Sequence, residues 1–145
     1  MAKKILVIDD EPLVTKTLVR CLAGYGYGII SANSGKEAIQ KAEEGYFDLI
    51  IADIRMPGMD GLETLKKLRT IFQNRYKRKV PEIVITGYAS EESEREAKEL
   101  GVSAYIYKPF DKDQFLEAIK TCLKIGIQIE SQEIWVDVPI FYKKD

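Results

Sequence analysis

Residues 48–61 read Asp48-Leu49-Ile50-Ile51-Ala52-Asp53-Ile54-Arg55-Met56-Pro57-Gly58-Met59-Asp60-Gly61 and place a carboxylate at the end of an apolar run. The run from Leu49 to Ala52 is partly β-branched, which predicts a strand buried on both faces of a parallel sheet. Pro57-Gly58 forces a turn beyond it. Because ligands bind just outside the carboxyl ends of strands in open parallel sheets, we expect Asp53 to face a functional site.

The composition is that of a soluble globular protein with one main domain. The chain has 145 residues, of which 46% are apolar and 31% charged, and its net charge is −1. So small a net charge gives no argument for a nucleic acid or an acidic partner. No run of 18 apolar residues occurs, and residues 1–4 lead directly into a short strand instead of a signal-peptide core. We therefore expect a cytoplasmic protein.

The chain contains no histidine, so imidazole is excluded as a metal ligand, general base or phosphoryl carrier. Its chemistry must use carboxylates, lysine, hydroxyls and a hard metal ion. The two cysteines, Cys21 and Cys122, fall on apolar faces of predicted helices without any metal-binding spacing. We expect them to be reduced thiols in or near the core.

Strand and helix patterns alternate strictly along the chain. Apolar runs predict five strands, at residues 4–8, 27–32, 49–52, 82–86 and 104–107. A helical pattern follows each run, as in Val14, Leu18 and Leu22, and Ser34 with Glu37 has the spacing of a capping box. Five β-α units in this order predict an α/β fold, a parallel sheet with helices on both faces and right-handed crossovers.

Polar residues stand where the predicted strands end. The first strand ends at Asp9-Asp10, the third at Asp53, the fourth at Thr86 and the fifth at Lys108. These ends share one edge of a parallel sheet, where three carboxylates repel one another unless a cation is present. Mg²⁺ suits such oxygen ligands, and the lysine and the hydroxyl can hold phosphoryl oxygens. The pattern indicates phosphoryl transfer onto an aspartate.

Each residue alone also has an ordinary interpretation. The acids at 9–11 can simply favour a helix N-terminus, Thr86 can be a strand-end threonine and Lys108 a solvated lysine. Their joint occurrence argues against these interpretations.

Four motifs together resemble the receiver domain of two-component response regulators, over residues 3–124. They are Asp9-Asp10, Asp53 before Met56-Pro57-Gly58-Met59-Asp60-Gly61, Thr86-Gly87, and Lys108-Pro109-Phe110. The resemblance implies a flavodoxin-like (βα)5 fold with strand order 2-1-3-4-5. The predicted organisation is a receiver domain at 1–124 and a C-terminal extension at 125–145 without a recognisable output domain.

The resemblance also implies a phosphorylation site. Asp53 would be the phosphoacceptor, and Mg²⁺, or Mn²⁺ as a substitute, would bind Asp10, Asp53, the backbone carbonyl of Arg55 and, through water, Asp9. The phosphoryl group would come in trans from a histidine kinase or phosphotransfer protein. The chain would catalyse only its own phosphorylation and dephosphorylation, and would not be an enzyme for another substrate.

Three further residues would read out the phosphorylation. Thr86 would be the switch hydroxyl, Lys108 the phosphoryl-contacting lysine, and Tyr105 the switch aromatic; the alternative for Tyr105 is plain packing. The Lys108-Pro109 bond would be cis. The surface made by the acidic helix at 91–100, the fifth strand and the last helix would change, and a homodimer through this surface or through the tail is possible. The downstream partner is not specified.

Arg55 and Tyr88 stand two residues beyond the acceptor and the switch threonine. We expect their side chains to flank the path of the attacking water and to slow hydrolysis of the phosphoaspartate. The alternative is that both are ordinary exposed loop side chains.

Two segments depart from a minimal receiver. Residues 66–79 hold seven cations and no acid, which indicates either a solvated helix end or a docking patch for an acidic partner, with direct nucleic-acid binding the weaker expectation. The tail at 125–145 is too apolar for a disordered segment. It can fold back on the domain, add a strand, pair with a second chain or be the start of a longer protein.

Three other functions fit these residues less well than the receiver does. A degenerate receiver, acting as a phosphorylation-independent interaction module, conflicts with the intact acidic set. A phosphatase-like hydrolase would want an aspartate two residues after Asp53, where this chain has Arg55. A flavodoxin would need a phosphate loop after the first strand, where Asp9-Asp10 would repel the phosphate.

Overall fold

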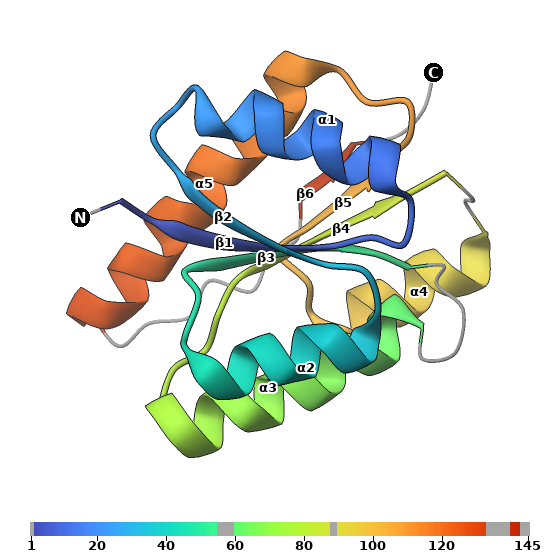
Figure 1. Cartoon of the computed structure of the whole chain (residues 1–145). Coiled ribbons are helices and arrows are strands. Elements are labelled where there is room, and N and C mark those ends of the chain that lie inside the picture. The colour runs from blue at the N-terminus through green and yellow to red at the C-terminus, as the bar shows by residue number, and fades with distance from the viewer. Residues whose placement is uncertain (1, 55–59, 88–89, 133–139, 143–145) are drawn as a thin grey trace.

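A computed structural model of the chain describes residues 2–54, 60–87, 90–132 and 140–142 (Figure 1). The strands in these ranges are β1 (Lys4–Ile8), β2 (Gly28–Ala32), β3 (Leu49–Asp53), β4 (Glu82–Thr86), β5 (Ala104–Tyr107) and β6 (Ile140–Tyr142). The helices are α1 (Pro12–Ala23), α2 (Gly35–Glu44), α3 (Gly61–Tyr76), α4 (Glu91–Leu100) and α5 (Lys112–Gln132). The α/β alternation predicted from the sequence is confirmed.

The strands form a single parallel sheet in the order β2-β1-β3-β4-β5-β6. Its first five strands have the predicted flavodoxin-like order 2-1-3-4-5. The sixth comes from the C-terminal tail, which pairs with β5 in the register Ala104↔Ile140 to Ile106↔Tyr142. Among the alternatives for the tail, the structure shows an added strand. Helix α5 continues to Gln132, past residue 124.

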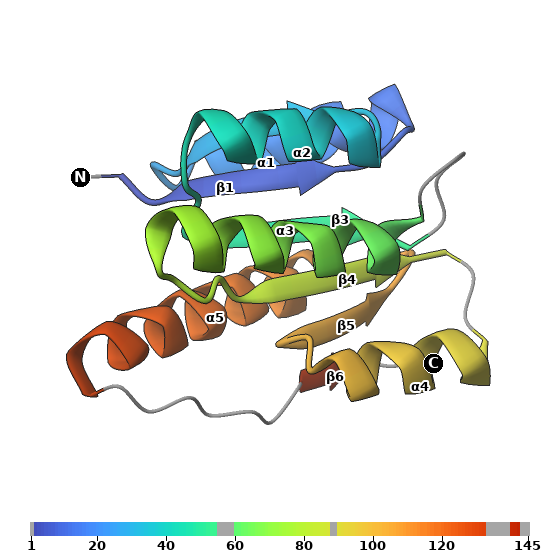
Figure 2. The same cartoon turned by 90° about the horizontal axis from the view of Figure 1, so that it is seen from below.

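Helices cover both faces of the sheet (Figures 1 and 2). Successive residues of a strand point to opposite faces, so Leu6 packs with the core under α2, α3 and α4, whereas Val7 packs with the core under α1 and α5. All five residues of β3 and β4 are buried. Burying each large aliphatic side chain contributes about 1.5–3 kcal/mol, which makes these central strands the rigid base of the sheet edge.

Side-chain caps begin several helices, and the one predicted from the sequence, Ser34, is confirmed. The Ser34 hydroxyl accepts from the Glu37 N–H at 3.1 Å, and the Ser90 hydroxyl accepts from the Ser93 N–H at 3.0 Å. At α3 the Asp60 carboxylate accepts from the Glu63 N–H at 2.8 Å. Each cap satisfies a backbone donor that the helix leaves unpaired and contributes about 1 kcal/mol.

The basic segment at 66–79 is partly built into the fold. The Arg69 guanidinium forms a two-pronged ion pair with the buried Glu82 carboxylate at the start of β4, and also donates to the Leu100 carbonyl at the end of α4. The Arg78 guanidinium lies 4.7 Å from the centre of the Tyr46 ring. These two cations therefore stabilise contacts between elements, whereas Lys66, Lys67 and Lys79 are exposed.

Both cysteines are free thiols. Cys122 is buried, and burial raises the pKa of its thiol to about 12. Among the described residues, no helix is both long and apolar enough to cross a membrane.

Candidate functional site

The ends of β1, β3 and β5 bring two carboxylates and a lysine together. The register pairs Ile8 with Ala52, so Asp9 and Asp53 follow side by side at the same edge of the sheet. The Asp9 N–H donates to the Ala32 carbonyl at 3.1 Å, which extends the pairing with β2 by one step. The residue after β5 is Lys108, whose N–H donates to the Thr86 carbonyl at 2.8 Å. Regular strand pairing thus positions all three side chains.

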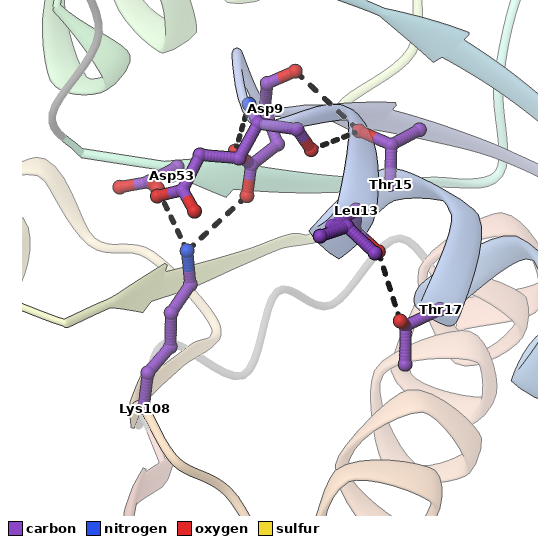
Figure 3. Close-up of polar contacts among 7 residues, drawn as sticks. Asp9, Leu13, Thr15, Thr17, Asp53 and Lys108 are labelled. Atoms are coloured by element: carbon purple, nitrogen blue, oxygen red, sulfur yellow. Dashed lines mark hydrogen bonds and ion pairs between the residues drawn. The ribbon is translucent and has the colours of Figure 1, made fainter.

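The Lys108 ammonium bridges the two carboxylates (Figure 3). Its Nζ donates to Asp53 Oδ2 at 2.8 Å and to Asp9 Oδ2 at 3.2 Å. Asp9 and Asp53 are buried, and the Lys108 side chain is only 17% exposed. Two carboxylates against one ammonium leave the buried site with a net negative charge, which favours a further cation.

Burial and pairing shift the ionisation of this cluster. Burial raises the pKa of Asp9 and outweighs the hydrogen bond from the Glu11 N–H at 2.9 Å and the attraction of Lys108. Burial alone would lower the pKa of Lys108, but the hydrogen bond and charge of Asp53, helped by Asp9, raise it overall. Lys108 is therefore a fixed cation at neutral pH.

The acidic side chains fit a hard divalent ion. Asp9, Asp10, Glu11 and Asp53 each offer a carboxylate oxygen, and these oxygens all lie within 4.8 Å of one another. A set made only of carboxylates is the chemistry that Mg²⁺ and Mn²⁺ accept. Glu11 was not among the residues expected to hold the metal. Its place next to Asp9-Asp10 in the sequence was the available signal.

A glycine lets α3 begin close to Asp53. A Cβ built on Gly61 would lie 2.1 Å from the Asp53 carbonyl oxygen, and the Gly61 N–H donates to the Ile54 carbonyl at 2.8 Å. No side chain fits there without moving the backbone that carries the carboxylate.

Two of the predicted site residues, Arg55 and Tyr88, lie outside the described residues. The structure therefore does not test the predicted roles of the Arg55 carbonyl and of the two side chains.

Thr86 and Tyr105 occupy the neighbouring strands. Thr86 is the buried last residue of β4, one step beyond Ile85, which pairs with Asp53. Tyr105 is fully buried in the core under α2, α3 and α4. Burial, and then the charge of Glu94, raises its pKa to about 12. The peptide bond between Lys108 and Pro109 is cis.

Tyr107 connects β5 to α4, a contact that sequence analysis missed. Its hydroxyl donates to Glu94 Oε2 at 2.9 Å, and its ring lies 5.2 Å from that of Tyr105 in an edge-on arrangement. Tyr107 and Glu94 are thirteen residues apart in the sequence and belong to no motif, so only the packing of α4 on β5 reveals the pair.

Comparisons with known proteins identify the family to which the chain belongs. A family model described as response regulator receiver domain matches residues 5–120. Transcriptional regulatory protein ZraR of Klebsiella oxytoca is 39% identical over 110 residues, covering 76% of this chain and 24% of that protein. Sporulation initiation phosphotransferase F of Bacillus subtilis is 33% identical over 125 residues, covering 86% of this chain and 97% of that protein.

A solved structure is similar over most of its length. Chemotaxis protein CheY4 of Vibrio cholerae has a TM-score of 0.76 and 32% identity, covering 84% of this chain and 99% of that chain. In contrast, the chain spans about a quarter of the length of the ZraR proteins that it matches.

Proposed function

Because the chain belongs to the response regulator receiver domains of two-component systems, we propose that it is a signalling switch turned on by phosphorylation of Asp53. The observation that carries this proposal is the Lys108 ammonium held between the Asp53 and Asp9 carboxylates. A lysine in this position can neutralise phosphoryl oxygens where the Asp53 carboxylate attacks. The donor is a histidine kinase or phosphotransfer protein, since this chain has no histidine of its own.

In the proposed reaction an oxygen of Asp53 attacks the phosphorus of a phosphohistidine. The phosphorus–nitrogen bond of the donor breaks, and an acyl phosphate forms on Asp53. Asp10, Asp53, the Arg55 carbonyl and, through water, Asp9 would hold Mg²⁺. The Glu11 carboxylate is close enough to the carboxylates of Asp9, Asp10 and Asp53 to join them. When bound, the ion neutralises charge on the transferred group. The chain thus promotes only its own phosphorylation and dephosphorylation.

The switch follows from the added charge. Phosphorylation replaces a monoanion with roughly a dianion that has strong acceptor oxygens. The Thr86 hydroxyl is drawn toward these oxygens, and Tyr105 repacks beside it. The contact between Tyr107 and Glu94 supports a path from the end of β5 to α4. The proposed output is a change of the surface made by α4, β5 and α5.

The test is the intact mass of the chain after incubation with acetyl phosphate. We expect one labile adduct of a phosphoryl group with Mg²⁺ present, and none when EDTA is added or when Asp53→Asn is used. An adduct on Asp53→Asn would place the acceptor elsewhere. Absence of any adduct from acetyl phosphate and from a phosphorylated histidine donor would favour a phosphorylation-independent interaction module.

Asp9→Asn should stabilise the metal-free protein at neutral pH while weakening Mg²⁺ binding. Folding raises the pKa of Asp9, so protonation of this carboxyl stabilises the folded state. This stabilisation is fully present below the ordinary pKa of 3.8 and is lost as the pH rises through the folded-state pKa. Asparagine stays neutral at every pH. In EDTA we expect a melting temperature a few degrees higher at pH 7, with the difference shrinking toward acidic pH.

The control for this comparison is Asp113→Asn. It removes the same charge from an exposed position in the first turn of α5, where a carboxylate favours the helix, and should not raise the melting temperature. A lower melting temperature for Asp9→Asn in EDTA would show that attraction to Lys108 outweighs the burial of Asp9.

A further inference from the structure

The helices divide between the two faces of the sheet in a way that constrains how strands connect. The core on one face contains residues of α2, α3 and α4, and the core on the other contains residues of α1 and α5 (Figure 1). The direction in which the chain moves across the sheet, together with the face that carries the connecting helix, defines the hand of each crossover.

The first four crossovers share one hand. From β2 to β3, β3 to β4 and β4 to β5, the chain moves toward the β5 side of the sheet through α2, α3 and α4 on one face. From β1 to β2 it moves the opposite way through α1 on the opposite face, which gives the same hand. This is the right-handed sense that parallel connections adopt in about 98% of cases.

The connection from β5 to β6 has the opposite hand. It continues in the direction of the preceding crossovers, from β5 to the sheet edge, but its helix α5 lies on the face of α1 (Figure 2). A β5-α5-β6 unit within one chain is therefore left-handed. Strand twist disfavours this arrangement, because a right-twisted strand followed by a helix packs back onto its sheet on the other side.

We propose that the outer edge of β5 is a strand-accepting interface that binds residues 140–142 of a second copy of this chain. When another copy supplies β6, that strand is not joined to this β5 through this α5, so the handedness rule does not apply. The strand from the second copy keeps the parallel register with β5, in which Ala104 pairs with Ile140, Tyr105 with Phe141 and Ile106 with Tyr142. Two copies exchange these segments reciprocally in a two-fold dimer.

The sequence around the exchanged strand fits this occupant. The segment Ile140-Phe141-Tyr142 consists of residues that favour strands, and residues 133–139 link it to α5. Main-chain pairing needs only an extended segment of matching length, which each copy carries. Exchange also leaves neither β5 edge open to uncontrolled pairing.

The first test is the mass of the unphosphorylated 145-residue chain, by light scattering over a roughly hundredfold range of concentration. We expect a monomer–dimer equilibrium in the wild type and its loss in the double variant Phe141→Pro/Tyr142→Pro, since successive N–H groups of a strand point to opposite sides and one of the two removed donors therefore faces β5. Phe141→Ala/Tyr142→Ala, which keeps the main chain intact, should retain the dimer. A monomer at every concentration, or a dimer that persists in the double proline variant, would overturn the proposal.

A second test identifies which copy supplies the strand. Ala104 and Ile140 are paired in the register, and neighbouring strands lie about 4.8 Å apart, within the range that a disulfide spans. Ala104→Cys with Ile140→Cys, in a Cys21→Ser background, should form a covalent dimer when mildly oxidised at high concentration. A disulfide-bonded monomer as the main product would show that each chain pairs with its own tail, against the proposal.

Discussion

Replacing Lys108 by methionine should slow phosphorylation of Asp53 by about 10²–10³-fold, the usual loss when one preorganised charge at a reacting group is removed. Methionine keeps much of the side-chain length and removes the cation that lies 2.8 Å from Asp53 and 3.2 Å from Asp9. The rate of adduct formation from acetyl phosphate, followed by intact mass at fixed Mg²⁺, measures the effect.

Lys112→Met is the matched control for this variant. Lys112 is exposed at the start of α5, so the same change of charge and shape there should leave the rate within about twofold of the wild type. The Lys108 variant has a second signature. With the ammonium gone, Asp9 and Asp53 repel each other, so Mg²⁺ should raise the melting temperature of Lys108→Met more than that of the wild type. An unchanged rate would remove Lys108 from the proposed reaction.

Arg69→Met should lower the unfolding free energy by about 3–5 kcal/mol, although Arg69 belongs to none of the motifs of the phosphorylation site. The Glu82 side chain is 2% exposed, and the variant takes away its two-pronged cationic partner. It also removes the donor to the Leu100 carbonyl, which joins α3 to the end of α4. Urea unfolding measures this loss. The midpoint should fall, while the slope of the unfolding free energy against urea concentration stays unchanged.

An exposed ion pair on the same helix provides the control. Lys67 Nζ lies 3.9 Å from Glu63 Oε1, and the two side chains are 52% and 55% exposed. Lys67→Met should therefore change the unfolding free energy by no more than about 0.5 kcal/mol. Adding Glu82→Gln to Arg69→Met should recover part of the loss, because no buried charge then lacks its cation. Equal effects of Arg69→Met and Lys67→Met would show that the Arg69 pair is screened like a surface pair.

Most of the fold could be predicted because its signals are local and repeated. The buried apolar runs, the capping serines and the strict alternation of strands with helices each depend on residues close together in the sequence. Parallel pairing then places every strand end at one edge, so the meeting of Asp9, Asp53 and Lys108 followed from topology although 99 residues separate the first from the last.

Other contacts could not be predicted because they depend on how the layers pack. The sequence shows Arg69 within a basic run, and the partner that makes it structural is a glutamate thirteen residues away on another element. The same holds for Tyr107 and Glu94. No motif marks such pairs, since their geometry depends on helix placement and not on local periodicity.

The sequence by itself determined the α/β class, the order of elements and the strand-end carboxylates and lysine, because periodicity and parallel topology are sufficient for these. Only the tertiary structure decided that residues 140–142 add a sixth strand beside β5, which cations are structural and how burial shifts the pKa of Asp9. The physical reason is that burial, charge pairing and strand-edge pairing are properties of surfaces brought together by folding, and their strength depends on distances that no local pattern specifies.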